Sequence, residues 1–528
     1  MITPPGNGPP GAAACAGGMP ARVDLLVIGG GINGAGIARD AAGRGLSVLL
    51  CEKDDLAQGT SSRSSRLVHG GLRYLEYGEL RLVREALQER EVLLAMAPHL
   101  VHPLRFVLPH VAQMRPFWML RAGLFLYDHL ARRRSLAASQ AVCLQEIPEG
   151  QTVRPHLRRG FVYADCRTDD ARLVIANARG AADLGACIRT RTAFTGAKAG
   201  DGRWEVSLLD TRSGARHTLQ ARALVNAAGP WVDQVAPDMA GITRARHVRL
   251  IKGSHLLVRK FWQGEHAYLL QNTDRRVVFV TPYEDGFAMI GTTDIAWQGR
   301  ADSVQISPEE TRYLLDAVNR QLRCALGPED ILGSFAGVRC LVDDQQENPS
   351  ALTRDYVLEL NTAADGAAAL SVLGGKITTY RRLAEHALDR LGPVFPDMGA
   401  AWTHRVPLPG GDYAGMDDAA QQSRWLAETA YLPAAHALGL WHRHGTLARR
   451  IVAQVQDLPG MGRHFGGGLY DCELRYLQEN EWAQTAEDVL WRRSKLGLLL
   501  SPDQVAGLEQ AFAGAENANG TPDRGAAA

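Results

Sequence analysis

The sequence has almost no excess of charge. Its 58 lysines and arginines and 57 aspartates and glutamates leave a formal net charge of +1 over 528 residues. Proteins that bind nucleic acids usually present a strongly basic face, so we expect no nucleic-acid partner. No apolar run approaches the roughly 20 residues that a membrane-spanning helix needs. The eight cysteines contain no C-x-x-C pair, which leaves a metal site or a redox dithiol without support.

The beginning of the chain lacks the basic segment and the apolar core of a signal peptide, and proline, glycine and alanine dominate it. We therefore expect a disordered tail at residues 1–20, with Met19 as an alternative start, and a second tail at 513–528. Because 528 residues exceed one ordinary hydrophobic core, two or three domains are expected between the tails.

The chain does contain one complete βαβ pattern. The apolar run 25–28 predicts a buried parallel strand. Three glycines with G-x-G-x-x-G spacing follow it, namely Gly29, Gly31 and Gly34. They permit a tight turn, the approach of a pyrophosphate and close packing of the next helix, whose N-terminus attracts phosphates. A second strand ends at Glu52, which can accept ribose hydroxyls, so the unit predicts dinucleotide binding and favours FAD or NAD over NADP.

Three further segments have the composition of ligand-binding turns. Residues 59–74 are rich in hydroxyl side chains and glycine but also contain apolar side chains, so we predict that this loop wraps a flat ligand. A buried strand ends in a glycine turn at Gly229. Another turn, at 373–380, places Gly375 and Lys376 beside a helix N-terminus, where an anion is favoured.

Residues 115–134 combine an apolar centre with flanking basic residues. The segment is too short to span a bilayer, but its composition suits a helix at the membrane interface, with Trp118 and Phe125 in the lipid. A core helix with a basic C-terminal turn is the alternative. The residues alone do not decide between the two.

The later part of the chain changes character twice. From about residue 240 to 335 the strands are longer and alternate in polarity, which predicts a mixed or antiparallel sheet inserted as a substrate platform. From about residue 400 the pattern is helical, most clearly at 446–456 and 482–500. Within the last segment, Thr485 and Asp488 fit a capping box or the start of a new helix.

Taken in order, a series of motifs resembles the FAD-dependent glycerol-3-phosphate dehydrogenases, the kind that reduces a respiratory quinone. The motifs are Ile28-Gly-Gly-Gly-Ile-Asn-Gly-Ala-Gly-Ile-Ala, His69-Gly-Gly-Leu-Arg-Tyr-Leu-Glu76, Asn226-Ala-Ala-Gly-Pro-Trp231, Arg249-Leu-Ile-Lys-Gly-Ser-His255, Ile290-Gly-Thr-Thr-Asp294, Thr353-Arg-Asp-Tyr356 and Gly374-Gly-Lys-Ile-Thr-Thr-Tyr380. The likeness covers about residues 21–500. It departs at Cys340, because the family usually has a proline after the arginine of Gly-Val-Arg.

We therefore expect an α/β fold, α+β overall, in which a Rossmann-like FAD-binding domain carries an inserted β-sheet and is followed by an α-helical C-terminal domain. The expected boundaries are 21–95, 160–235 and 335–392 for the FAD-binding domain, 96–159 and 236–334 for substrate-binding or capping insertions, and 400–512 for the helical domain.

The resemblance implies oxidation of sn-glycerol 3-phosphate to dihydroxyacetone phosphate, with hydride transfer from C2 to flavin N5 and electrons passed to ubiquinone or menaquinone. The groups that match the family at the C2 hydroxyl are His255 and Arg339, and the sequence does not decide which accepts the proton. A dianionic phosphate needs paired cations, for which the candidates are Arg73, Arg354 and Lys376, with Tyr74 as an additional phosphate contact. The nearest alternative is an oxidase on the same fold that passes electrons to oxygen and releases peroxide. A more distant one is a related amine or amino-acid oxidase, against which the arginine and lysine set argues.

FAD is the cofactor that the resemblance implies. Its candidate contacts are Gly29, Gly31, Gly34 and Glu52 at the nucleotide end, and Thr60, Ser61, Ser62, Ser65, Gly229, Gly375 and Thr378 towards the flavin. Because a reduced quinone leaves through lipid, we expect a cytoplasmic protein peripherally associated with the inner face of the cell membrane, with 115–134 as its contact. A homodimer is the family expectation.

Overall fold

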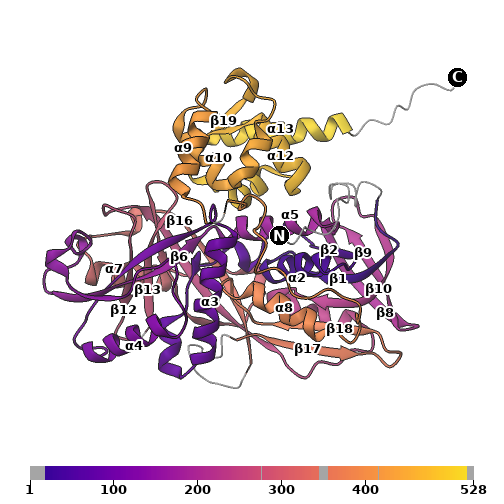
Figure 1. The fold of residues 1–528 in the computed structure, drawn as a ribbon, viewed down its shortest axis with the longest axis horizontal. Coiled ribbons are helices and arrows are strands. Elements are labelled where there is room, and N and C mark those ends of the chain that lie inside the picture. Colours follow the sequence, from indigo (N-terminus) through magenta and orange to yellow (C-terminus); the bar gives the residue numbers. More distant parts are fainter. Residues whose placement is uncertain (1–17, 275, 344–354, 414, 520–528) are drawn as a thin grey trace. The chain divides into compact units, whose positions relative to one another are not determined.

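The computed structural model describes residues 18–274, 276–343, 355–413 and 415–519, and the chain divides into two compact units (Figure 1). One unit holds Met1–Met96 and Val101–Val406, and the other holds Ala97–Leu100 and Pro407–Ala528. Among the described residues, no helix combines the length and the apolar character needed to cross a bilayer.

The first sheet of the larger unit contains the βαβ pattern of the sequence. Strands β18, β10, β1, β2 and β7 are parallel neighbours in that order, and β17 adds an antiparallel edge. Their bounds are β1 Arg22–Ile28, β2 Val48–Cys51, β7 Cys187–Arg189, β10 Arg216–Asn226, β17 Val357–Thr362 and β18 Ala368–Leu373. A hairpin of β8 (Thr192–Gly200) and β9 (Arg203–Asp210) pairs with the first half of β10.

Three helices accompany this sheet: α2 (Ile32–Gly43), α5 (Asp170–Asp183) and α8 (Tyr380–Arg390). Helix α2 packs against both of the others. A Cβ at Gly36 would lie 2.8 Å from the Tyr380 ring, so the small residue allows α2 and α8 to approach closely. The Asn177 side chain of α5 donates to the Tyr380 hydroxyl at 2.9 Å, which joins α5 to α8.

The second sheet is mostly antiparallel and runs β15-β11-β14-β13-β12-β4-β6-β3, with β16 paired to β11 and β5 paired to β6. Only the β12–β4 pair is parallel among the described strand pairs of this sheet. The bounds are β3 Leu67–Val68, β4 Val101–Pro109, β5 Gln140–Cys143, β6 Arg159–Thr168, β11 Val248–Arg259, β12 Ala267–Gln271, β13 Val277–Tyr283, β14 Phe287–Gly291, β15 Ile295–Trp297 and β16 Ile331–Val342.

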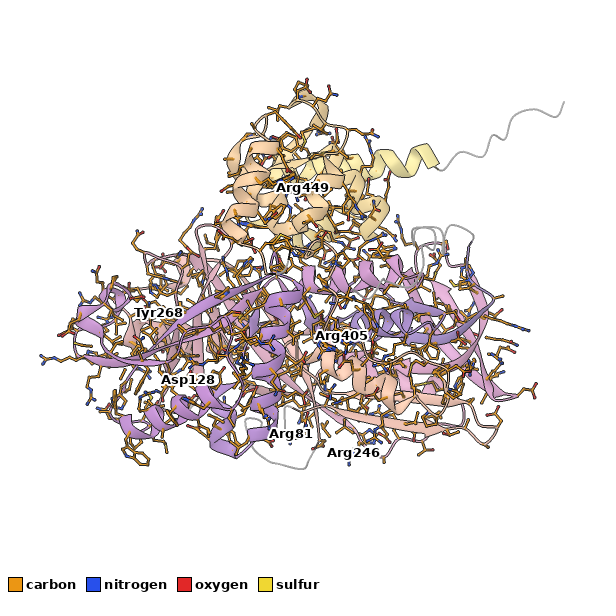
Figure 2. All side chains as sticks on the ribbon, in the orientation of Figure 1. Arg81, Asp128, Arg246, Tyr268, Arg405 and Arg449 are labelled. Carbon is orange, nitrogen blue, oxygen red and sulfur yellow. The ribbon has the colours of Figure 1, made fainter. Side chains whose placement is uncertain are left out.

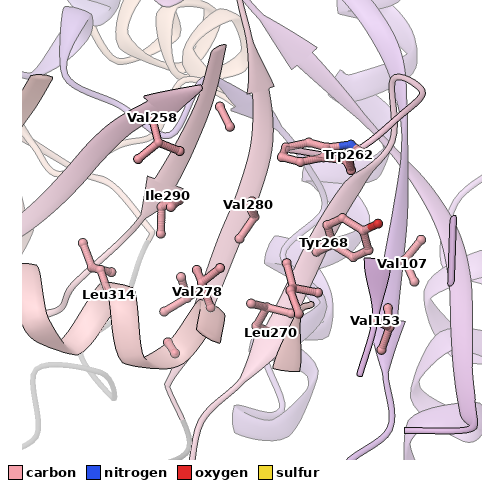
Figure 3. Close-up of a cluster of buried hydrophobic side chains, with 14 of the residues drawn as sticks. Val107, Val153, Val258, Trp262, Tyr268, Leu270, Val278, Val280, Ile290 and Leu314 are labelled. Carbon is pink, nitrogen blue, oxygen red and sulfur yellow. The ribbon is translucent and has the colours of Figure 1, made fainter. Parts of the chain in front are cut away.

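Hydrophobic clusters cover the second sheet. Tyr268 of β12, labelled in Figure 2, is fully buried, and its hydroxyl donates to the carbonyl of Glu149 at 2.8 Å. Figure 3 shows it among the side chains that pack with helix α7 (Pro308–Gln321). A separate cluster joins the sheet to α3 (Leu80–Met96) and α4 (Phe117–His129). The predicted membrane-interface segment therefore contains a helix whose inner face is part of a core.

The smaller unit is largely helical. Its helices are α9 Asp418–Glu428, α10 Ala434–His444, α11 Ala448–Ile451, α12 Asp471–Glu481 and α13 Pro502–Asn519, and β19 (His464–Gly466) pairs with β20 (Leu469–Tyr470). The segment predicted to be helical over 482–500 is not one continuous helix, and the new start that the sequence left open at Thr485 and Asp488 is the alternative that forms. Trp482 is left-handed with φ of 56°, and the segment contains a π-helix at Asp488–Arg493 and a 3-10 turn at Leu496–Leu498.

The segment 482–500 is interrupted because its side chains form local hydrogen bonds with the backbone. Thr485 and Asp488 exchange side-chain to backbone hydrogen bonds of 3.1 and 3.2 Å, so the capping box predicted there starts a new turn. The predicted helix over 446–456 is also shorter, because only α11 and the preceding 3-10 turn at Gly445–Leu447 form. The fold class predicted from the sequence, a Rossmann-like domain with an added sheet and a helical C-terminal part, is confirmed.

Candidate functional site

A cavity of about 350 Å³ lies at the carboxyl ends of the parallel strands. Gly29, at the end of β1, has φ of +110°, and a Cβ there would lie 2.7 Å from the carbonyl oxygen of Ala227. A Cβ at Gly34 would lie only 1.9 Å from the carbonyl oxygen of Gly29, so the first turn of α2 requires glycine. Gly34 serves this packing and does not line the cavity, whereas Gly29 and Gly31 line it.

Glu52 stands at the end of β2, on the wall of the same cavity. Its carboxylate accepts from the backbone N–H of Gly30 at 2.7 Å and of Asp54 at 2.9 Å. Burial raises the pKa of this carboxyl, although the two N–H donors favour its charged form. The bonds fix the orientation of the carboxylate and leave lone pairs for hydroxyl donors, which suits the ribose of a dinucleotide.

The hydroxyl-rich loop lies along this cavity. Thr60 donates to the carbonyl of Val338 at 2.6 Å, and the hydroxyl of Ser61 accepts from the N–H of Ile32 at 3.0 Å. The predicted cofactor residues that line the cavity are Gly29, Gly31, Glu52, Thr60, Ser61, Ser65, Gly229, Gly375 and Thr378. Ser62 does not line it, while its neighbours Arg63 and Ser64, which the sequence did not single out, do. This cavity, lined by glycines and short hydroxyl side chains at the ends of the parallel strands, fits FAD.

His255 of β11 closes one side of the cavity. It is 3% exposed, its Nε2 lies 2.9 Å from the Ser65 hydroxyl, and its ring stacks on Phe335 at 4.9 Å. Burial, and secondarily the charge of Arg339, lower its pKa to about 3. The imidazole is therefore neutral at neutral pH and has a lone pair with which it can accept a proton.

Arg339 of β16 lines the cavity beside His255. Its Nη2 donates to the carboxylate of Asp294 and to the carbonyl of Thr293, both at 3.0 Å. Because a guanidinium keeps its proton at neutral pH, this group offers positive charge and hydrogen-bond donors. Asp294 is missing from the sequence prediction, although it ends the Ile-Gly-Thr-Thr-Asp motif quoted there.

The predicted phosphate ligands are divided between two places. The Lys376 ammonium lies 4.9 Å from the centre of the Tyr74 ring, in the first cavity. Its Nζ is buried without a hydrogen-bond partner in the part of the chain that the structure describes, and burial lowers its pKa. Arg73 instead lies in a second cavity, 3.9 Å from Asp294. Arg354 lies outside the described residues.

The second cavity, of about 170 Å³, adjoins the first. Both are lined by Ser65, Leu67, His69, Tyr74, Thr292 and Arg339. His69 was not predicted as a site residue, although it opens a motif quoted for the resemblance. Burial, followed by the charge of Lys376, lowers its pKa to about 3. His69 therefore has a lowered pKa where the two cavities meet, and His255 and Lys376 have lowered pKa values in the first cavity, as is typical of a reaction centre.

A buried polar network supports the loop that carries Arg73 and Tyr74. The N–H of Gly70 donates to the Tyr127 hydroxyl of α4 at 2.8 Å, and this hydroxyl donates to Asp165 at 2.8 Å. Asp165 also forms an ion pair with Arg90. After Gly71, whose φ is +78°, the chain folds so that a Cβ at Gly71 would lie 2.2 Å from the Tyr74 ring.

Comparisons with known proteins agree with this geometry. The family model described as FAD dependent oxidoreductase matches residues 24–381, and the model described as the C-terminal domain of alpha-glycerophosphate oxidase matches 401–515. The D-erythritol 1-phosphate dehydrogenase of Brucella abortus is 52% identical, over 95% of this chain and 99% of that protein. The glycerol-3-phosphate dehydrogenase of Pseudomonas aeruginosa is 54% identical, over 92% of this chain and 94% of that protein.

Among solved structures, the glycerol-3-phosphate dehydrogenase of Bacillus halodurans, complexed with FAD, is similar with a TM-score of 0.76 at 26% sequence identity. The match covers 97% of this chain and 93% of that one. The similarity therefore extends over both compact units and over the whole cavity that fits FAD. FAD is the cofactor of this chain.

Proposed function

The chain belongs to the family of FAD-dependent glycerol-3-phosphate dehydrogenases, and from that premise we propose that it oxidises sn-glycerol 3-phosphate to dihydroxyacetone phosphate. The observation that carries the proposal is the Lys376 ammonium, buried without a hydrogen-bond partner among the described residues, in one cavity with His255 and Arg339. A buried charge is costly until an opposite charge joins it, so this cation suits the phosphate of the substrate.

FAD, when bound, supplies the hydride acceptor for the carbon that is oxidised. Within this chain, Gly29, Gly31 and Glu52 would hold the nucleotide end, because they line the strand ends beside the N-terminus of α2. The residues that would lie towards the flavin are Thr60, Ser61, Gly229, Gly375 and Thr378.

His255 is the base in this proposal and Arg339 the stabilising cation. The neutral imidazole can take the C2 hydroxyl proton, and Ser65 orients its ring through the 2.9 Å contact. Arg339 faces the oxygen on which negative charge develops, and its bonds to Asp294 and Thr293 fix the guanidinium before the substrate arrives. A preformed donor of this kind needs no reorganisation during the reaction.

For the electron acceptor, we propose a membrane quinone, either ubiquinone or menaquinone, reached from the cytoplasmic side. Helix α4 supports this placement. Its outer face exposes Trp118 (70%) and Phe125 (56%), while Leu124 and Tyr127 are buried on its inner face. Arg132, Arg133 and Arg134 follow the helix, where they would meet anionic headgroups. We also expect a homodimer, which light scattering in detergent tests.

The central test is an anaerobic titration of the purified protein with glycerol 3-phosphate. Bleaching of the oxidised flavin absorbance is expected, and the reoxidation rate with a quinone then identifies the acceptor. A flavin that is present but not bleached would reject the substrate assignment and favour an amine-oxidising enzyme. Peroxide formed in stoichiometric yield despite added quinone would favour the oxidase, with which the C-terminal family model shares a description.

The membrane contact has its own test. The double variant Trp118→Ser and Phe125→Ser should lose binding to anionic vesicles at moderate salt, yet retain bleaching by the substrate. Leu499→Ser is the matched control, because Leu499 is 49% exposed and lies in the other unit. Equal vesicle binding by all three proteins would remove α4 as the contact.

A further inference from the structure

His255 and Arg339, the two groups that the proposed reaction uses, belong to one face of the second sheet. His255 lies in β11, and Arg339 of β16 is paired with Ile251 of that strand. Side chains two residues apart along a strand share a face, and so do directly paired residues, so both groups belong to the face that borders the first cavity. By the same alternation, Lys252 and Ser254 belong to the opposite face, which we call the rear face.

Helix α7 covers the rear face. Leu256 of β11, two residues after Ser254, forms one cluster with Ile290 of β14 and Leu314 of α7, the last two labelled in Figure 3. Glu310 is the third residue of this helix, is 2% exposed, and lines neither cavity. A carboxylate in this place acts on the reaction through the residues that it holds.

Glu310 accepts hydrogen bonds from four groups. Its Oε1 accepts from the hydroxyl of Ser254 at 2.9 Å and from the hydroxyl of Thr293 at 2.7 Å. Its Oε2 accepts from the Lys252 ammonium at 2.7 Å and from the N–H of Ser307 at 2.9 Å. Burial acts to raise the pKa of this carboxyl, but the four donors outweigh it and hold the pKa below its ordinary value. The bond from Ser307 belongs to the capping box of α7, whereas the other three reach the sheet and its connections.

Thr293 extends this set of bonds to Arg339. It lies in the segment Thr292–Asp294 between β14 and β15, and its carbonyl accepts from Nη2 of Arg339 at 3.0 Å. Its hydroxyl, besides donating to the buried carboxylate, accepts from the N–H of Ser254 at 3.0 Å. The residue that anchors the guanidinium is therefore joined to the strand position directly before His255.

The segment Thr292–Asp294 and strand β11 are in close contact at Gly253. A Cβ at Gly253 would lie 2.5 Å from the Thr292 hydroxyl and 3.1 Å from Nη2 of Arg339. The segment also accepts from that Nη2 twice. A shift of the segment against β11 therefore moves the guanidinium relative to the His255 ring.

We propose that Glu310 is a positioning residue for the reaction, which fastens the segment Thr292–Asp294 to β11 and thereby sets the Arg339 guanidinium beside the His255 ring. This rests on the proposed function, in which the imidazole accepts the hydroxyl proton and the guanidinium faces the developing charge. Both interactions strengthen as the hydride leaves, whereas the phosphate is bound by Lys376. Displacement of the two groups therefore slows flavin reduction and changes substrate affinity little.

The first experiment compares Glu310→Gln with the wild-type holoenzyme. The amide keeps the size of the side chain, but its nitrogen cannot accept a hydrogen bond, so two of the four donors lose their acceptor. Anaerobic stopped-flow absorbance gives the limiting rate constant of flavin reduction and the half-saturating concentration of glycerol 3-phosphate. We expect the rate constant to fall at least about tenfold and the half-saturating concentration to change less than about threefold.

Glu473→Gln is the matched control. Glu473 is 1% exposed, accepts from Arg443 at 2.7 Å, contacts His444 at 2.9 Å and lies in the other unit. Both variants should unfold at a lower temperature, because each removes the charge of a buried ion pair, but only Glu310→Gln should slow flavin reduction. A rate constant within about twofold of the wild type, or an equal fall in both variants, overturns the proposal. A wild-type flavin that glycerol 3-phosphate does not reduce overturns the proposed function as well.

The second experiment changes the hydroxyl that joins Glu310 to the segment. Thr293→Val keeps the shape of the side chain but removes its donor and acceptor, whereas Thr293→Ser keeps the hydroxyl. We expect the limiting rate constant to fall about tenfold in Thr293→Val and to stay within about threefold of the wild type in Thr293→Ser. Equal rate constants in the two variants would overturn the proposal, because the hydroxyl would then contribute nothing to the reaction.

Discussion

The two adjoining cavities are built in opposite ways. The first is shaped by backbone turns, where glycines at the strand ends leave room and short hydroxyl side chains fix the loops around it. The second is lined by charged side chains that hold one another, such as Arg115 with Glu76 and Arg339 with Asp294. The first cavity therefore depends on side-chain atoms that glycines leave out, whereas the second depends on charged side chains whose positions depend on each other.

The largest effect should come from adding a side-chain atom to Gly34, in the first turn of α2 beside the first cavity. Gly34→Ala places a Cβ 1.9 Å from the Gly29 carbonyl oxygen, so β1 and α2 must move apart. We expect loss of bound FAD and at least about 2 kcal/mol of destabilisation. Flavin content and thermal unfolding measure this. Gly123→Ala is the control, since a Cβ at Gly123 in α4 meets no atom within 4 Å. Normal flavin content in Gly34→Ala would contradict the account.

A second substitution should separate chemistry from cofactor binding. Arg339→Lys removes the planar fork that reaches both Asp294 and the Thr293 carbonyl. We expect the rate of flavin reduction to fall about 100-fold while FAD stays bound, because lysine keeps the positive charge but loses the guanidinium donors that are fixed beside the developing charge. Stopped-flow absorbance measures the reduction. Turnover close to that of the wild type would remove Arg339 from the mechanism.

A smaller effect should show which cavity holds the phosphate. Lys376→Met is expected to lower kcat/KM for glycerol 3-phosphate by about 10- to 100-fold, the range of a charge-assisted hydrogen bond. Glycerol, which has no phosphate, should lose far less. Arg73→Met is the comparison, because Arg73 lies in the second cavity beside Asp294. A greater loss for Arg73→Met would reverse the proposed orientation of the substrate.

The smallest effect concerns the proton that His255 of the first cavity can bind. His255 has a pKa of about 3 in the folded protein because of burial, against 6.5 for the ordinary side chain. Between these values the unfolded chain binds one proton more, so the free energy of unfolding falls as pH falls, by about 1.4 kcal/mol per unit at most. Proton uptake on unfolding near pH 5 should be about one lower in His255→Gln. Equal uptake would show that His255 is already protonated in the folded protein.

The sequence predicted best what is local. The βαβ unit follows from residues 25–52, because a buried strand, a glycine turn and an acid at the next strand tip are all encoded within one short segment. The helical segment predicted at 482–500 is interrupted, as the new start left open at Thr485 allowed, because buried hydrogen bonds override helix propensity there. The Arg493 guanidinium, for example, donates to the Glu481 carbonyl at 2.5 Å.

The substrate side could be predicted only in part. One cavity brings together four of the predicted residues, His255, Arg339, Tyr74 and Lys376. Arg73 lies apart from Lys376, because within the Leu72–Tyr77 segment Tyr74 lines the first cavity and Arg73 lines only the second.

The border between the two cavities depends on Gly71. The ring of Tyr74 occupies the space that a side chain at position 71 would need, and that ring lines both cavities. A methyl group added there would clash with that ring and would have to take up a left-handed backbone conformation that side chains rarely adopt, so the border between the two cavities depends on a residue that has no side chain.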